Sequence, residues 1–147
     1  MRVVVQKCTK SSVEVDNKLI SKIDKGLMVL VGFTHSDTEK DIDYIVKKVI
    51  NLRVFEDENN VMNKSVLDEH GEILCISQFT LYGDTKKGNR PSYINAMPGK
   101  NSVLLYDLFC SKLNEFIPTK KGIFGADMKV SLINDGPTTI IIDSNDK

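Results

Sequence analysis

The sequence contains no tryptophan, only three cysteines and only two histidines among 147 residues. Cys8, Cys75 and Cys110 are odd in number and far apart, without the paired spacing of a zinc site or a redox dithiol. We interpret them as free thiols, with Cys75 and Cys110 as core residues. His35 and His70 have no Cys, Asp or Glu at a spacing typical of metal ligation or of a catalytic triad. The sequence therefore predicts no metal site.

An excess of charge of one sign is also absent, because 20 Lys and Arg balance 20 Asp and Glu. Without a net field, any binding to a nucleic acid must be local. No apolar run approaches the ~20 residues of a membrane span, and the first ten residues lack a secretory signal. Gly83, Gly88 and Gly99 are too scattered for a nucleotide-binding loop. We expect a cytoplasmic protein with no membrane partner and no cofactor.

The length and the hydrophobic fraction of 41% are typical of one globular domain, which we assign to residues 1–147. A β-branched run begins at Val3 and alternates up to Val15, and the Asp16-Asn17 turn then leads into residues 19–24, which together predict a hairpin. Residues 27–33 are apolar on both faces, as in a central strand. Two further strands are expected at residues 128–133 and 138–142.

Two segments have the apolar spacing of amphipathic helices. Ser36 and Glu39 have the spacing of a capping box, which predicts a helix over residues 37–52. A second helix is expected over residues 101–117, ended with the help of Pro118. Because strands outnumber helices and come mostly in antiparallel-looking pairs, we expect an α+β fold. Its mostly antiparallel sheet would be rolled into a barrel-like core with two amphipathic helices, in a single domain.

Polar residues end the apolar strand that begins at Glu72. Ser77, Gln78, Phe79 and Thr80 offer two hydroxyls, an amide and backbone N–H groups where a strand end can face a cleft. Strict alternation would separate them onto two faces unless the strand ends there. The pattern alone fits a solvated strand end equally well.

Two other segments have a functional and a plain interpretation. Lys86, Lys87 and Arg90 form a basic patch in the loop of residues 83–100, suited to phosphates but equally typical of a solvated loop. Asn134-Asp135-Gly136-Pro137 has the composition of a turn, and we favour a simple connection between strands from the pattern alone.

Several ordered motifs over the whole chain resemble the D-aminoacyl-tRNA deacylase family. They are Met1-Arg2-Val3-Val4-Val5-Gln6, Asn51-Leu52-Arg53-Val54-Phe55, Ser77-Gln78-Phe79-Thr80-Leu81, Phe124-Gly125-Ala126-Asp127-Met128 and Asn134-Asp135-Gly136-Pro137. The resemblance implies a homodimer that hydrolyses the ester between a D-amino acid and tRNA. It also implies glycyl-tRNA mischarged on alanine tRNA as a substrate.

The resemblance also implies roles for individual residues. Ser77, Gln78, Phe79 and Thr80 would form the catalytic strand end, with backbone N–H groups around Phe79 and Thr80 as the oxyanion hole. A cis Gly136-Pro137 segment, crossing into the partner's site, would reject L-amino acids. Substrate binding and chiral selection would further involve Lys7, Met128 and Asn134, and tRNA binding would involve Lys86, Lys87, Arg90, Phe124 and Ala126.

The sequence departs from the family pattern at three positions. Lys7 stands where most relatives have an arginine that braces the Gly-Pro segment, and lysine cannot make the same forked contact. Thr138 replaces a usual valine and Asn89 a common basic residue. These departures bear on the rigidity of the pocket and on RNA affinity.

Two other functions remain open at this point. The first is an editing enzyme for tRNA mischarged with an L-amino acid, like relatives that clear L-alanine or L-serine from threonine tRNA. The second is a non-catalytic module that binds the tRNA end, since the same fold is attached to some archaeal threonyl-tRNA synthetases. Hydrolysis of the aminoacyl-tRNA ester would distinguish an enzyme from a module that only binds the tRNA end.

Overall fold

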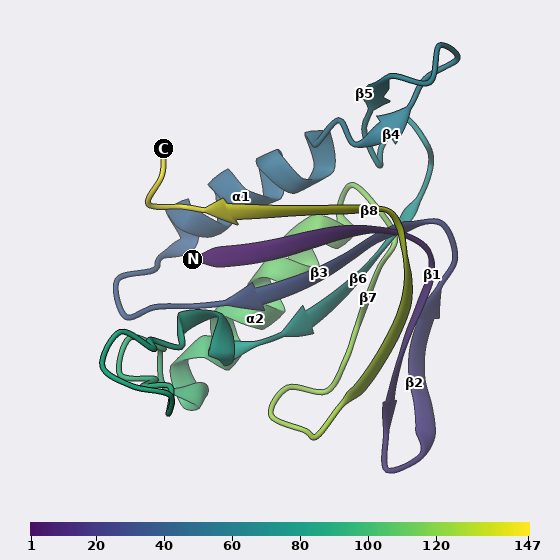
Figure 1. Ribbon diagram of the computed structural model, residues 1–147. Coiled ribbons are helices and arrows are strands. Elements are labelled where there is room, and N and C mark those ends of the chain that lie inside the picture. Colours follow the sequence, from purple (N-terminus) through teal and green to yellow (C-terminus); the bar gives the residue numbers. More distant parts are fainter.

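A six-stranded sheet forms the centre of the computed structural model, which describes residues 1–147 (Figure 1). The strand order is β2-β1-β3-β6-β7, and β8 pairs with β1. A separate two-stranded sheet consists of β4 and β5. The elements in chain order are β1 (Arg2–Val15), β2 (Lys18–Ile23), β3 (Gly26–Gly32), α1 (Glu39–Asn51), β4 (Phe55–Glu56), β5 (Met62–Lys64), β6 (Glu72–Ser77), the 3-10 helix η1 (Phe79–Tyr82), α2 (Gly99–Asn114), β7 (Thr119–Lys121) and β8 (Lys129–Asp143).

The sheet is mixed and nearly closed into a barrel. β1 pairs antiparallel with β2, β3 and β8, whereas β3–β6 and β6–β7 are parallel. The barrel stays open between β2 and β7, where side chains bridge the gap. Ser21 Oγ donates to the Lys121 carbonyl over 2.7 Å, and Lys120 Nζ donates to the Lys22 carbonyl over 2.8 Å. The predicted α+β class, with a rolled and mostly antiparallel sheet, is confirmed.

Both helices pack on one face of the sheet, behind it in Figure 1. They share a core cluster of 22 buried residues that includes Ile42 and Ile45 of α1, Phe109 and Leu113 of α2, and Val29 of β3. A smaller cluster of six buried residues, with Met28 and Leu74 among them, lies apart from it. No helix of the structure is both long and apolar enough to cross a membrane.

The cysteines are all buried and free. Burial raises the pKa of the Cys8 thiol to about 11, and burial also raises the pKa of Cys75. Because the thiolate is the nucleophilic form, the raised pKa values make the Cys8 and Cys75 thiols unreactive core residues.

Two predicted boundaries are wrong. The capping box at the start of α1 is formed by Thr38 and Asp41, whose Oδ2 accepts from the Thr38 backbone N–H over 2.9 Å, and not by Ser36 and Glu39. Asn134-Asp135-Gly136-Pro137 does not connect two strands, because β8 runs unbroken from Lys129 to Asp143. Pairing with β1 resumes on both sides of the segment, at Asn134 and at Thr139, so residues 135–138 form an irregularity within the strand and not a turn between two strands.

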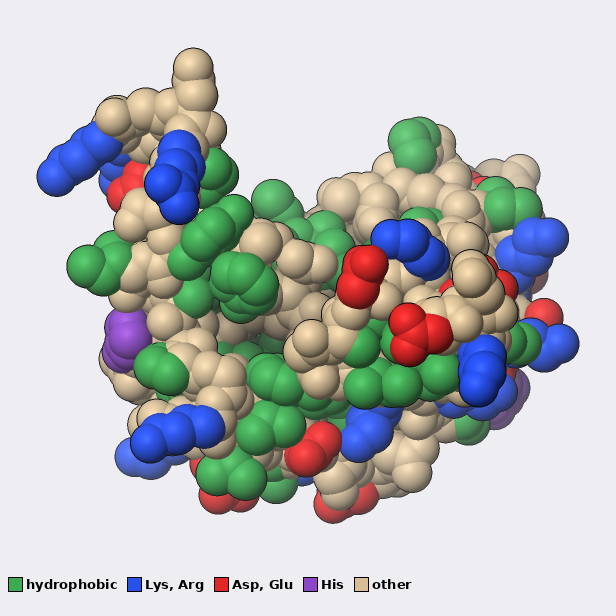
Figure 2. Space-filling view, turned by 90° about the horizontal axis from the view of Figure 1, so that it is seen from below, with side chains coloured by type: hydrophobic (Ala, Val, Ile, Leu, Met, Phe, Trp, Pro, Cys, Tyr) green, Lys and Arg blue, Asp and Glu red, His purple; other side chains and the backbone are tan.

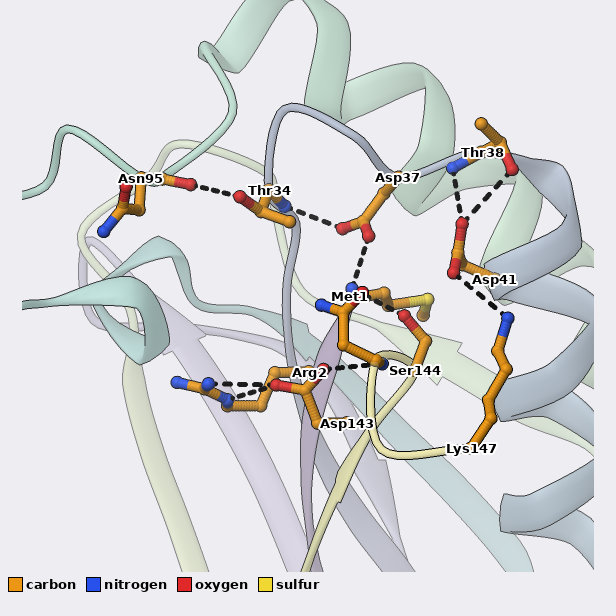
Figure 3. A network of polar contacts seen from close by, with 11 residues as sticks. Met1, Arg2, Thr34, Asp37, Thr38, Asp41, Asn95, Asp143, Ser144 and Lys147 are labelled. Atoms are coloured by element: carbon orange, nitrogen blue, oxygen red, sulfur yellow. Dashed lines mark hydrogen bonds and ion pairs between the residues drawn. The ribbon is translucent and has the colours of Figure 1, made fainter.

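A polar network around the first residue joins three distant segments of the chain (Figure 3). The buried α-ammonium of Met1 donates to Asp37 Oδ1 and, over 2.9 Å, to Ser144 Oγ. The other carboxylate oxygen of Asp37 accepts from the Thr34 backbone N–H over 2.7 Å. Thr34 Oγ1 in turn donates to the Asn95 carbonyl over 2.6 Å. The network thus fixes the end of β3, the chain after β8 and the base of the loop before α2.

Replacing Asp37 with alanine should destabilise the fold strongly. The Met1 ammonium would stay buried without its counter-charge, a loss typically worth ~3–5 kcal/mol. The measurement is the free energy of unfolding in urea, followed by circular dichroism. Asp107→Ala is the control, because it breaks an exposed ion pair with Lys121 and should cost under ~1 kcal/mol. Equal unfolding midpoints for the two variants would contradict this account.

Candidate functional site

A pocket lies beyond the carboxyl ends of the three parallel strands β3, β6 and β7. Parallel strands end at the same edge of a sheet, and the loops that follow them commonly surround a binding site. Here Val31 pairs with Ser77, so Gly32 and Phe33 lie beside Gln78 and Phe79. The segment after β7 and the start of α2 complete a cavity of about 590 Å³. In Figure 2 hydrophobic side chains gather around a hollow in the middle of this face.

Six of the predicted site residues line this one cavity. They come from the end of β6 and from the segment between β7 and β8: Ser77, Gln78, Phe79, Phe124, Ala126 and Met128. The structure therefore brings together two motifs that are about 45 residues apart in the sequence. Thr80 is exposed next to them and does not line the cavity.

The polar strand end is followed by the short helix η1, which keeps Ser77, Gln78, Phe79 and Thr80 near one another. β6 ends at Ser77 and η1 begins at Phe79, so the alternation that would place these side chains on opposite faces stops there. The Gln78 backbone N–H donates to the Val31 carbonyl over 2.7 Å. Arg2 Nη1 donates to the Leu81 carbonyl over 2.8 Å, while Arg2 Nε donates to Asp143. Strand β1 thus holds the far end of η1.

The hydroxyl of Thr80 accepts a hydrogen bond from Nε2 of Gln78. An amide N–H cannot take a proton from a hydroxyl, so this contact does not activate Thr80 as a nucleophile. Among the residues that line the cavity only Asp127 and Tyr93 are titratable, and Asp127 forms an ion pair with Lys129 over 3.3 Å. The two histidines lie outside the lining. The protein therefore offers binding surface and backbone donors here, without an evident general base.

The Gly136-Pro137 segment lies outside the cavity of its own chain, in the irregular part of the β1–β8 pairing. Its peptide bond is cis, and the φ of Gly136 is +121°. A Cβ atom at Gly136 would lie 2.5 Å from Oγ1 and 2.6 Å from N of Thr138. No L side chain fits this backbone without displacing the segment.

Asn134 and Lys7 support that segment from β8 and β1. Oriented to satisfy its polar atoms, the Asn134 amide donates over 3.0 Å to the carbonyls of both Thr138 and Lys7. Its oxygen accepts from Thr139 Oγ1 and Gln6 Nε2. The Lys7 side chain is 7% exposed, and its Nζ lies 3.8 Å from a carboxylate oxygen of Asp135. The ammonium thus contacts the neighbour of Gly136 through a single ion pair and donates no hydrogen bond to Gly136 or Pro137.

The predicted basic patch stands on a projecting hairpin, not on the cavity wall. Asp84 and Ser92 exchange two backbone hydrogen bonds of 2.8 and 2.9 Å, which close residues 84–92 into a loop. Lys86, Lys87 and Arg90 lie exposed within it, and none of them has an ion-pair partner. In Figure 2 a lobe bearing Lys and Arg side chains rises beside the hollow, at the upper left. We call residues 84–92 the basic hairpin.

Sequence reasoning missed several residues of the wall. Tyr93, Ala96 and Met97 belong to a segment that we expected only to be an exposed loop, and Gly99 and Ser102 open α2. A bridge between Thr34 and Ala96, and the bond from the Met97 N–H to the Phe33 carbonyl, pull the segment onto the end of β3. The one available signal was the presence of apolar residues in a segment rich in helix breakers.

The lining offers no group of three or more His, Cys, Asp or Glu side chains that could hold a metal ion, and neither does any other part of the chain. The ligands that the geometry suits are therefore those held by apolar contact and by a few hydrogen bonds, as in most small-molecule sites.

Comparisons with known proteins agree in both sequence and structure. A D-aminoacyl-tRNA deacylase of Flavobacterium psychrophilum is 56% identical, over all of this chain and 99% of that protein. One of Clostridium botulinum is 53% identical, over 98% and 97%. A solved structure titled c-Myc DNA Unwinding Element Binding Protein superposes with a TM-score of 0.93 at 44% identity, over 97% of this chain and 98% of that one.

A second solved structure bears on the fold alone, because its sequence is only 18% identical. It is titled as a probable eukaryotic D-amino acid tRNA deacylase and superposes with a TM-score of 0.82, over 96% of this chain. Residues 4–143 match the family described as D-Tyr-tRNA(Tyr) deacylase. Together with the relatives of more than 50% identity, this match shows that the chain belongs to the D-Tyr-tRNA(Tyr) deacylase family, enzymes that hydrolyse the ester bond of aminoacyl-tRNA.

Proposed function

We propose that this enzyme proofreads chirality, releasing D-amino acids from tRNA in the cytoplasm, and that two copies of the chain build each site. The observation that carries the proposal is the separation of the two motifs. Ser77, Gln78 and Phe79 line the cavity, whereas Gly136 and Pro137 lie outside the cavity of the same chain. The second motif can therefore complete the site only in another copy. Ile133 and Ile141, exposed on the same strand, offer apolar surface for such a contact.

The site would select D-amino acids by sterically excluding the side chains of L-amino acids. Backbone carbonyls of the partner's Gly136-Pro137 segment would hold the amino group of the substrate and leave no room for an L side chain. A D side chain points away from that wall, so many D-amino acids would be accepted. Glycine has no side chain to clash, and glycyl-tRNA mischarged on alanine tRNA would therefore also be hydrolysed.

For the chemistry, water adds to the ester carbonyl, and the bond from that carbon to the ribose oxygen breaks. Backbone N–H groups of Phe79 and Thr80, the first two residues of η1, have no partners within that helix and would stabilise the oxyanion. Each such donor is typically worth ~3–4 kcal/mol. Since the one carboxylate of the lining, Asp127, is paired with Lys129, we expect the ribose 2′-OH next to the ester to assist, and the departing ribose oxygen would receive the proton.

The first test compares D-tyrosyl-tRNA, L-tyrosyl-tRNA and glycyl-tRNA under identical conditions. We expect rapid loss of the D and glycyl esters and persistence of the L ester, followed by release of the labelled amino acid. Loss of both tyrosyl esters would mean a pocket without chiral selection, and Lys7 would be the first residue to replace, with arginine. Binding of tRNA without hydrolysis of any ester would favour the module that only binds tRNA ends.

The RNA-assisted route can be separated from a protein nucleophile at Thr80. Thr80→Ala should retain hydrolysis within about tenfold, because its hydroxyl is not activated. A substrate ending in 2′-deoxyadenosine should lose ~10²–10⁴-fold in rate, the usual range for positioned acid–base assistance. The readout is single-turnover hydrolysis of D-tyrosyl-tRNA. A folded Thr80→Ala enzyme that binds substrate but is inactive would exclude this mechanism.

The two-chain site predicts complementation between inactive variants. Gly136→Val should disrupt the Gly-Pro segment, and Ala126→Trp should fill the cavity. After the two proteins are unfolded together and refolded, half of the dimers should be mixed, and one of the two sites in each mixed dimer should be intact. We expect about a quarter of wild-type activity. No recovery, despite mixed dimers detected by mass spectrometry, would show that each chain builds its own site.

A further inference from the structure

The mouth of the cavity carries a pair of aromatic rings, and the proposed chemistry does not use either ring. Phe79 and Tyr93 both line the cavity, yet the two residues remain 57% and 39% exposed. Their ring centroids lie 5.0 Å apart with an interplanar angle of 70°. Ile94, the next residue in the chain after Tyr93, is 77% exposed. Apolar and aromatic surface gathered at the rim of a pocket typically marks a binding surface.

Tyr93 is held in place from two sides. On one side lies the basic hairpin, closed by the hydrogen bonds between Asp84 and Ser92. On the other, the Ile94 carbonyl contacts Nε2 of His35 over 2.8 Å, and the Asn95 carbonyl accepts from Thr34. The ring also packs on Gly83, where an added Cβ would come within 3.2 Å of Tyr93 Cε1. A ring that is already fixed loses little freedom when a ligand stacks on it.

The surroundings of this pair indicate a charged ligand. The basic hairpin adjoins Tyr93 directly and carries three cations against one acid, Asp84, whose Oδ1 already accepts from the Lys86 N–H over 2.8 Å. Aromatic rings next to unpaired cations are the combination that binds single-stranded nucleic acid, with bases stacked on the rings and phosphates near the cations. An apolar peptide would have no use for the cations.

We infer that Tyr93 is the stacking platform for the nucleotide that precedes the terminal adenosine of tRNA, and that the basic hairpin contacts the phosphates leading to it. The inference rests on the proposed function, which puts the terminal nucleoside and its amino acid in the cavity. From there the RNA must leave across the rim, and Tyr93 is the rim residue next to the cations. The bases of the unpaired CCA end of tRNA are not held by a partner strand, so they are free to turn out and stack on an aromatic side chain.

The test uses two short D-tyrosyl esters, one of adenosine and one of the dinucleotide CpA, which differ only by the preceding nucleotide. For the wild-type enzyme we expect kcat/KM to be ~5- to 160-fold higher on the CpA ester, the range equivalent to ~1–3 kcal/mol for a stacked base. Tyr93→Ala should bring this ratio close to one, and Tyr93→Phe should preserve it. An ester with an abasic residue in place of cytidine should resemble the adenosine ester.

Each other outcome has a distinct meaning. If kcat/KM on the CpA ester is close to that on the adenosine ester for the wild-type enzyme, or if their ratio is unchanged in Tyr93→Ala, the assignment of Tyr93 as the stacking platform is wrong. A shift of Tyr93→Ala from dimer to monomer in sedimentation would instead assign Tyr93 to contact with a second copy, which also overturns it. If the wild-type enzyme hydrolyses neither short ester nor D-tyrosyl-tRNA, the proposed function itself fails. The thermal unfolding midpoint of each variant controls for misfolding.

Discussion

The double pairing of β1 is the constraint on which the rest of the structure depends. Residues 2–14 of this strand bond to β8 along one edge, and to β3 and then β2 along the other. Buried backbone groups need partners, so neither edge can be given up without cost. The β3 edge sets the register of the parallel strands whose ends surround the cavity. The β8 edge holds the Gly136-Pro137 segment away from that cavity, and the arrangement of both motifs follows from one strand.

The cavity itself is unusual in how little ionisable chemistry it contains. Its wall is made mostly of backbone, glycine and apolar side chains, and its polar side chains are those of Ser77, Gln78, Ser102, Tyr93 and the ion-paired Asp127. A wall of this kind positions a substrate and supplies hydrogen-bond donors without changing its own protonation state. Such a site suits a reaction in which the substrate carries its own hydroxyl next to the scissile bond. The family, the geometry and the proposed RNA-assisted route are consistent with one another on this point.

Much of the fold was predictable, because alternation and helical spacing are local properties of the sequence. The errors came where a distant contact decided between local options. Ser36 and Glu39 fit a capping box as well as Thr38 and Asp41 do, but Asp37 is drawn towards the Met1 ammonium and the Thr34 N–H. Asn134 to Pro137 has turn composition, yet β1 pairs with Asn134 and with Thr139 on the other side, which keeps the segment within one strand. Tyr93 reaches the cavity through the contacts of residues 94–97 with Phe33, Thr34 and His35, just after β3, and no local pattern encodes these contacts.

The pairing of β1 with β8 also has a consequence for how the protein is made. The ribosome produces residues 2–14 well before residues 129–143, so one edge of β1 has no partner until the more than 100 residues between them have been made. Open strand edges invite pairing with other chains, and sheets closed by such distant segments form slowly. The nascent chain therefore carries an open strand edge until β8 is made, and any delay in translation between β1 and β8 would prolong that exposure.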